Sequence, residues 1–196
     1  MDIKPKFKVY IIHGWSGSPE EPMLKWLADE LKKNGFEVMA PAMPDTDEPK
    51  IGTWVPFLQN LVGIPNENTF FVGHSIGCQA ILRFLETLPE ETKIGGAVFI
   101  AGWYDVRNID TEEDRKIVAP WVNTPRNDER IKKILAGKAT VLLSDDDPFV
   151  APENKEAWIK KAGAKVLECH GKGHFDARAG ITSLPEAFDA LLNFRL

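Results

Sequence analysis

Six short apolar segments, separated by stretches with helical spacing, constrain the fold of this chain more than any other feature of its sequence. They are residues 9–12, 36–40, 69–72, 97–100, 140–143 and 164–167. Most are continuously apolar rather than alternating, as expected for parallel strands that helices cover on both faces. Strands that alternate with helices predict an α/β fold with a mainly parallel sheet and right-handed crossovers. In such sheets, ligands bind beyond the carboxyl ends of the strands.

The helical stretches and the chain length indicate the domain organisation. A chain of 196 residues fits one domain of ordinary size, so we expect a single domain over residues 1–196. Apolar residues at helical spacing, such as Leu24, Leu27 and Leu31, fill most gaps between the strands. The longest stretch without a clean period is 102–125, where aromatic residues lie among charges. We expect this stretch to form a short cap over a pocket.

Composition and charge narrow the range of partners and surroundings. The net charge of −5 and the lack of a Lys/Arg-rich run argue against a nucleic-acid partner. The apolar run 9–12 is too short for a secretory signal or a membrane span, so we expect a soluble cytoplasmic protein with no membrane partner. Cys78 and Cys169 match no metal or redox spacing. We expect free buried thiols and no metal or other cofactor.

A Gly-x-Ser-x-Gly pentapeptide, residues 73–77, follows the third apolar segment and precedes a helical pattern. In this strand–turn–helix context, the serine is held in a strained turn that exposes its hydroxyl. Gly73 and Gly77 are needed because a Cβ at either position would collide with neighbouring chain. Ser75 is therefore a candidate nucleophile. A purely structural turn is the alternative, since Gly and Ser are common turn residues.

A glycine-rich turn, residues 13–17, follows the first apolar segment. Backbone N–H groups at such a turn can point into the crevice beside a serine nucleophile and form an oxyanion hole. We expect the amides of Trp15 and Ile76 to have this role. The alternative is an ordinary loop between a strand and a helix, because glycine is common in loops.

An acidic turn follows the fifth apolar segment, and a histidine in a glycine-containing loop follows the sixth. Asp147, directly before Pro148, is the candidate carboxylate that orients a histidine. Asp145 and Asp146 are expected to be turn and capping residues. His174 is the histidine whose loop can turn its side chain back over the sheet, although a loop histidine taken alone is more often a surface residue. The chain order is then serine, aspartate, histidine, each at the carboxyl end of a strand.

Four segments resemble those of a known family, and each follows a predicted strand: residues 13–15, 73–77, 144–150 and 171–175. They resemble the α/β-hydrolase superfamily and, more closely, its small serine-hydrolase branch, which includes retinoblastoma-binding protein 9 and bacterial YdeN-like proteins. The resemblance covers nearly the whole chain. It implies a compact α/β-hydrolase with six parallel strands in the order 2-1-3-4-5-6. It also implies a catalytic triad of Ser75, Asp147 and His174.

One motif departs from this branch. Its human member is associated with a Leu-x-Cys-x-Glu motif that binds a pocket protein. The corresponding residues here are 167–171, and Gly171 stands where the glutamate would be. We therefore do not expect that interaction.

The residues and the resemblance together predict a carboxylesterase-like serine hydrolase. Its expected partner is a small-molecule or short acyl substrate, with an ester, thioester or amide bond that is cleaved through an acyl-enzyme. Trp15, Trp103, Tyr104 and Trp121 are candidates to line an apolar pocket, although aromatic residues beside a sheet are often part of the core. Two alternatives stay open. One is a peptidase or amidase, and the other is a non-catalytic, protein-binding member that keeps the hydrolase scaffold.

Overall fold

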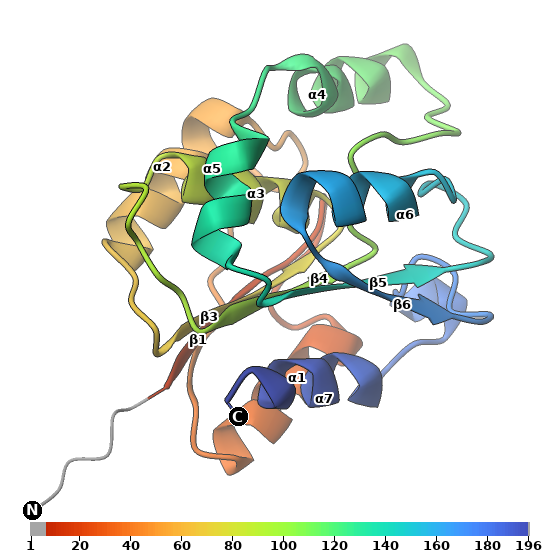
Figure 1. The fold of residues 1–196 in the computed structure, drawn as a ribbon. Helices are drawn as coiled ribbons and strands as arrows, with labels where there is room; N and C mark the ends of the chain where they lie inside the picture. Colours follow the sequence, from red (N-terminus) through yellow and green to blue (C-terminus); the bar gives the residue numbers. More distant parts are fainter. Residues whose placement is uncertain (1–6, 196) are drawn as a thin grey trace, which may run out of the picture.

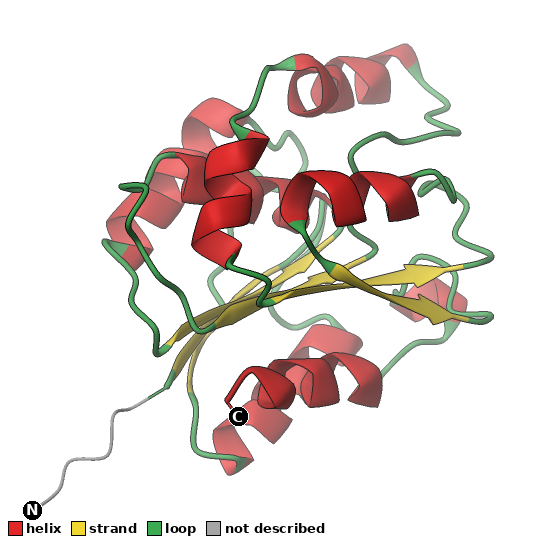
Figure 2. Cartoon of the chain, in the orientation of Figure 1, coloured by secondary structure: helices red, strands yellow, loops and turns green. Residues whose placement is uncertain are grey.

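A parallel sheet of six strands lies at the centre of this computed structural model, which describes residues 7–195 (Figure 2). The strands are β1 (Lys8–Ile12), β2 (Glu37–Met39), β3 (Thr69–His74), β4 (Gly96–Ile100), β5 (Ala139–Ser144) and β6 (Lys165–Cys169). Their order is β2-β1-β3-β4-β5-β6, and every neighbouring pair is parallel. This architecture confirms the predicted fold class and the strand order that the resemblance implied.

The central strands differ from the edge strands in burial. β3, β4 and β5 are buried along their full length, which is what continuous apolar runs predict for strands covered on both faces. β2 has only three residues, and β6 is partly exposed along most of its length. Because β6 is an edge strand, the loop that follows it has only β5 as a neighbouring strand.

Helices cover both faces of the sheet (Figure 1). One face carries α1 (Pro22–Lys33) and α7 (Pro185–Leu192), which contact each other. The other carries α2 (Ile51–Val62), α3 (Ile76–Glu86), α5 (Asp128–Leu135) and α6 (Asn154–Ala157), and a π-helical turn, Trp158–Ala162, continues α6. Short 3₁₀ turns occur at Ala177–Ala179 and Asn193–Arg195. Across residues 7–195, no helix combines the length and apolar character needed to cross a membrane.

Helix α4 (Glu112–Asn123) lies in the stretch for which no helix was predicted, and Figure 1 shows it farther from the sheet than α3 and α5. The Thr111 hydroxyl caps its start by accepting a hydrogen bond from the Asp114 N–H at 3.0 Å. Only Val118 and Trp121 are buried within the helix. Two buried positions are too few to give the apolar period from which helices were predicted.

The two cysteines lie in separate elements of the interior, Cys78 in α3 and Cys169 at the end of β6. Both are free and buried, as predicted. Burial raises the pKa of each thiol, so both side chains stay protonated near neutral pH.

Candidate active site

Ser75 lies in the sharp turn between β3 and α3. Its backbone has φ 52° and ψ −121°, outside the favoured regions for a residue with a side chain. A Cβ on Gly73 would lie 2.8 Å from the Cys78 nitrogen, and one on Gly77 would lie 2.4 Å from the Ile12 oxygen. Both glycines are therefore needed for the close contact between this turn and its neighbours, as the sequence predicted. The turn places Ser75 at the carboxyl end of the sheet.

Three predicted site residues, Ser75, His174 and Asp147, follow different strands and are joined by a chain of hydrogen bonds. His174 Nε2 lies 2.9 Å from Ser75 Oγ. His174 Nδ1 lies 2.9 Å from Asp147 Oδ2 and 3.1 Å from Oδ1. A carboxylate only accepts hydrogen bonds, so Nδ1 carries the proton that it donates to Asp147. The lone pair of Nε2 then faces the Ser75 hydroxyl and can accept its proton.

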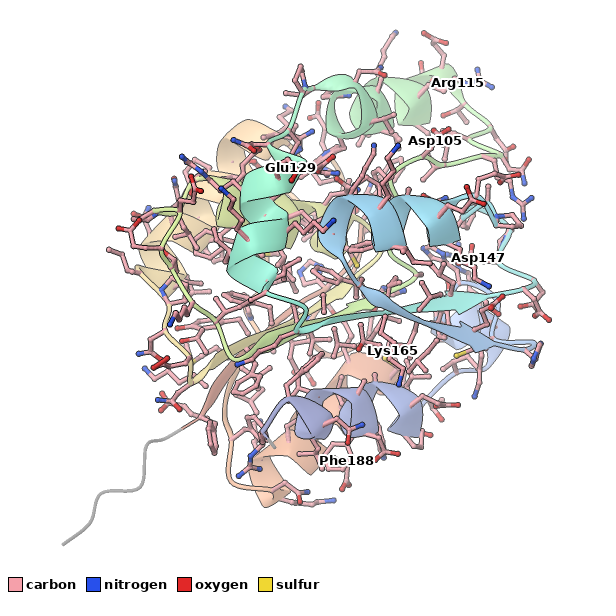
Figure 3. All side chains as sticks on the ribbon, viewed as in Figure 1. Asp105, Arg115, Glu129, Asp147, Lys165 and Phe188 are labelled. Atoms are coloured by element: carbon pink, nitrogen blue, oxygen red, sulfur yellow. The ribbon has the colours of Figure 1, made fainter. Side chains whose placement is uncertain are left out.

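Asp147 is fixed in place by its own turn. Figure 3 labels it at the carboxyl end of β5. The residue is only 1% exposed, and its Oδ1 accepts hydrogen bonds from the backbone N–H groups of Phe149 at 2.9 Å and Val150 at 3.1 Å. A buried carboxylate is stable only when such donors replace the lost water. These two amides therefore orient the carboxylate that holds His174.

The two predicted oxyanion amides belong to residues that line the same cavity beside Ser75. Ile76 is the first residue of α3, so its N–H has no partner within the helix. Within the described part of the chain, the Trp15 N–H has no hydrogen-bond acceptor. The Trp15 indole donates to the Asp47 carbonyl at 3.0 Å, which anchors this loop to a neighbouring one. Both backbone N–H groups are thus without a protein acceptor in the described residues, as a donor of an oxyanion hole must be.

His13 holds the loop that carries Trp15. Its Nδ1–H donates to the Gly14 carbonyl at 2.8 Å, and its Nε2 accepts the Met43 N–H at 3.0 Å. The side chain is buried, and this burial lowers the pKa of His13. Both ring nitrogens are occupied by backbone groups of a neutral imidazole, so His13 is a structural residue of the loop.

His74 makes a contact that the sequence did not predict. Its Nε2–H donates to the main-chain carbonyl of His174 at 2.8 Å. Burial, followed by the proximity of His174, lowers the pKa of His74 to about 4, so the ring is neutral near pH 7. The partner lies a hundred residues away in sequence. No local pattern could have identified this pair.

The described histidines and carboxylates near Ser75 do not form a metal site. Among residues 7–195, no group of three or more His, Cys, Asp or Glu side chains is arranged to hold a metal ion.

A cavity of about 350 Å³ opens beside Ser75 and His174. Its apolar lining consists of Trp15, Ile76, Trp103, Val106, Ile109, Val118 and Phe149. Its charged lining residues are Glu21, Asp110, Asp114, Asp176 and Arg178. The cavity therefore offers an apolar wall next to the nucleophile, with carboxylates prominent among its charged groups.

Two of the four aromatic residues predicted for the pocket line this cavity, and two do not. Trp15 and Trp103 are among its lining residues. Tyr104 packs edge-on against Trp158, with ring centroids 5.1 Å apart. Trp121 is 1% exposed and donates its indole N–H to the Pro49 carbonyl at 3.0 Å. Tyr104 is thus used in packing against the π-helical turn, and Trp121 of α4 packs against Trp54 of α2, with ring centroids 6.1 Å apart.

Several residues of the stretch 102–125 line the cavity, and buried polar groups of α3 anchor this stretch at both ends. The Gln79 side chain donates to the Trp103 carbonyl. Arg83 donates to the carbonyls of Trp121 at 3.1 Å and Thr124 at 2.7 Å. The helix that begins at the Ser75 turn therefore also positions the segment on the opposite side of the cavity.

A six-stranded parallel sheet in this order, with a strained serine after β3 and a histidine and an aspartate after later strands, defines an α/β-hydrolase. The model of the serine hydrolase family matches residues 9–193, and the chain belongs to this family. Family membership confirms the resemblance that the motifs carried and supports a hydrolase function.

Individual relatives agree with this assignment. The chain is 29% identical over 187 residues to the putative hydrolase YdeN of Bacillus subtilis (strain 168), and this alignment covers 95% of each chain. It is 25% identical over 166 residues to the serine hydrolase RBBP9 of Rattus norvegicus, covering 83% of this chain and 78% of that protein. The crystal structure of the ydeN gene product from B. subtilis superposes with a TM-score of 0.87 at 28% identity, over 97% of this chain and 99% of that one.

Proposed function

We propose that this chain hydrolyses small esters, thioesters or amides through an acyl-enzyme on Ser75, with His174 as general base and Asp147 as the group that orients it. The observation that carries the proposal is the hydrogen-bonded line from the Asp147 carboxylate through both nitrogens of His174 to the Ser75 hydroxyl. A serine hydroxyl is a weak nucleophile unless an adjacent base accepts its proton, and this geometry supplies that base.

In the first step, Ser75 Oγ attacks the carbonyl carbon of the substrate while His174 Nε2 takes the hydroxyl proton. The negative charge that develops on the carbonyl oxygen is stabilised by the amides of Trp15 and Ile76. Asp147 holds the Nδ1 proton and stabilises the positive imidazolium. The protonated His174 then gives its proton to the leaving alcohol, thiol or amine, and the bond to that group breaks.

In the second step, water replaces the leaving group. His174 takes a proton from the water as its oxygen attacks the acyl carbon, and the same two amides hold the oxyanion again. When the intermediate collapses, Ser75 recovers its proton from His174 and the carboxylic acid is released. The cycle returns every group to its starting protonation state.

The size of the cavity favours a small acyl group. A volume of about 350 Å³ lies near the lower end of the range for ligand pockets, roughly 300–1,000 Å³. We propose that residues 102–125 act as a cap, with α4 closing the apolar wall opposite Ser75. Val118 of α4 is a lining residue and is only 7% exposed, which supports this role.

A fluorophosphonate probe tests the proposal directly because it reacts with serines that a base activates. The wild type should be labelled, whereas Ser75→Ala should not, and His174→Ala should be labelled far more slowly. Paired p-nitrophenyl esters and anilides would then separate an esterase from a peptidase or amidase. A folded wild type that resists labelling and hydrolyses no member of the panel would contradict the proposal and favour a non-catalytic binding protein.

A further inference from the structure

The loop that carries His174 is attached to an edge of the sheet and is rich in glycine. It continues from β6, whose single neighbouring strand is β5. Gly171 and Gly173 have φ values of 63° and 50°. Glycine allows an unrestrained loop many backbone conformations, and each of them would move the imidazole. Contacts from outside the loop must therefore hold His174 at Ser75.

The turn after β5 supplies such contacts to successive residues of the loop. Asp145 Oδ2 lies 2.7 Å from His170 Nδ1, and Asp145 Oδ1 accepts the Gly171 N–H at 3.0 Å. Ser144 Oγ accepts the Lys172 N–H at 2.9 Å. The turn and the loop are thus joined residue by residue up to the last position before Gly173.

Asp146 makes the next contact and Asp147 the last one. Asp146 Oδ1 accepts the Gly173 N–H at 2.8 Å and the Ser144 hydroxyl at 2.6 Å. Asp147 then binds His174 Nδ1. Asp146 therefore holds the backbone directly before the imidazole, while its neighbour holds the imidazole itself.

The side chain of Asp146 is exposed to solvent, so a substitution there does not disturb the packing of the core. Asp146 and Asp145 are exposed, whereas Ser144 and Asp147, which flank this pair, are buried. The Ser144 hydroxyl, followed by the Gly173 N–H, lowers the pKa of the Asp146 carboxyl, so it is ionised and accepts both bonds near neutral pH. An exposed side chain contributes little to apolar packing, so its contacts with the loop are its main structural effect.

We propose that Asp146 is a positioning residue for His174: together with Ser144, it fixes Gly173 and thereby holds the imidazole in line with the Ser75 hydroxyl. This inference rests on the proposed function, in which His174 is the general base. It gives Asp146 a specific task in place of the turn or capping role expected from the sequence.

Two substitutions at the same position test the proposal. Both hydrogen bonds end on Oδ1, so Asp146→Asn keeps the acceptor and removes only the charge, whereas Asp146→Ala removes the acceptor. A misplacement of a reacting group by about 1 Å can cost about a hundredfold in rate. We expect kcat of Asp146→Ala to fall roughly 10- to 100-fold, with KM within about twofold of the wild type. Asp146→Asn should retain kcat within about threefold.

The control is Glu153→Ala, which removes an exposed carboxylate of equal charge from the neighbouring segment and should leave kcat unchanged. A wild-type kcat in Asp146→Ala would overturn the proposal, as would equal losses in the Asn and Ala variants. If Asp146→Ala does not fold, Ser144→Ala removes the hydroxyl that links Lys172 to Asp146 and should lower kcat without changing KM. An unchanged kcat in that variant would also overturn the proposal.

A spectroscopic measurement keeps this inference distinct from the proposed function. The proton between His174 Nδ1 and Asp147 should give a downfield imidazole resonance in the NMR spectrum of the whole protein. Asp146→Ala should broaden or lose it, and Asp146→Asn should retain it. A protein that shows this pattern but no turnover would refute the proposed function alone. If the wild type is active and the downfield resonance is unchanged in Asp146→Ala, the positioning role alone is refuted.

Discussion

The side chain of His74, in the nucleophile turn, donates a hydrogen bond to the main-chain oxygen of His174, whose own side chain contacts Ser75. The nucleophile turn and the loop that carries His174 are therefore joined twice, through Ser75 Oγ and through His74 Nε2. A carbonyl only accepts, so Nε2 must carry a proton, and the low pKa of His74 keeps the ring neutral. The structural contact thus depends on a histidine that does not titrate near pH 7.

The lowered pKa of His74 predicts a loss of stability in acid. The unfolded value is about 6.5 and the folded value about 4, so between these values the unfolded chain binds more protons. Stability attributable to His74 is then fully present above pH 6.5 and is lost as the pH falls through this window. The loss amounts to roughly 3 kcal/mol by pH 4. Urea unfolding at pH 7, 5.5 and 4 measures it.

His74→Gln is the matched variant for this measurement. Its side-chain amide can donate to the His174 carbonyl but does not titrate in this range. Its free energy of unfolding should decline less steeply than that of the wild type between pH 6.5 and 4. Other groups with shifted pKa values, including His13, are present in both proteins and cancel in the difference. Parallel pH profiles for the two proteins would contradict the assignment.

The fold was predictable from the sequence because burial on both faces leaves continuous apolar runs in β3, β4 and β5. α4 was not predictable in this way. It lies away from the sheet and buries only Val118 and Trp121, so its sequence carries capping and charge signals without an apolar period.

The candidate site was predictable because residues with suitable side-chain chemistry directly follow predicted strands. Ser75, Asp147 and His174 each follow a strand, and parallel strands bring such positions to one edge of the sheet. Side-chain direction within loops was not predictable, which is why Trp103 lines the cavity and its neighbour Tyr104 packs against a helix.

The tight contact beneath the nucleophile turn predicts that Gly77→Ala disrupts the site. The added Cβ would lie 2.4 Å from the Ile12 oxygen and 2.6 Å from the His13 oxygen, and backbone cannot move aside without shifting β1. We expect destabilisation by at least about 2 kcal/mol, with loss of fluorophosphonate labelling.

Gly52→Ala is the control, since nothing lies within 4 Å of its added Cβ. In helix α2 it should stabilise by about 0.5–1 kcal/mol, measured by urea unfolding.

The acceptor role of Asp147 predicts a large effect of Asp147→Asn on turnover. An amide that donates to Nδ1 would favour the wrong imidazole tautomer and leave a proton on Nε2, where the base is needed. We expect kcat to fall by about 10³- to 10⁴-fold with the fold retained. Steady-state hydrolysis of a p-nitrophenyl ester measures the change, and circular dichroism checks the fold. A near-normal rate in Asp147→Asn, with a loss in Asp145→Asn or Asp146→Asn, would show that the carboxylate was wrongly chosen.

The position of Val118 in the proposed cap predicts an effect on the acyl length that the cavity accepts. Its side chain comes from α4 and lines the cavity beside Ser75, so Val118→Trp should fill part of the space available to the acyl group. Each methylene that is excluded from an apolar pocket changes discrimination by about 1–3 kcal/mol. The ratio of kcat/KM for p-nitrophenyl butyrate to that for p-nitrophenyl acetate should therefore fall at least about tenfold.

Val122→Trp is the matched control, because Val122 lies one turn further along α4 and is not part of the cavity lining. An equal fall in both variants would indicate a general disturbance of α4 rather than a filled acyl pocket.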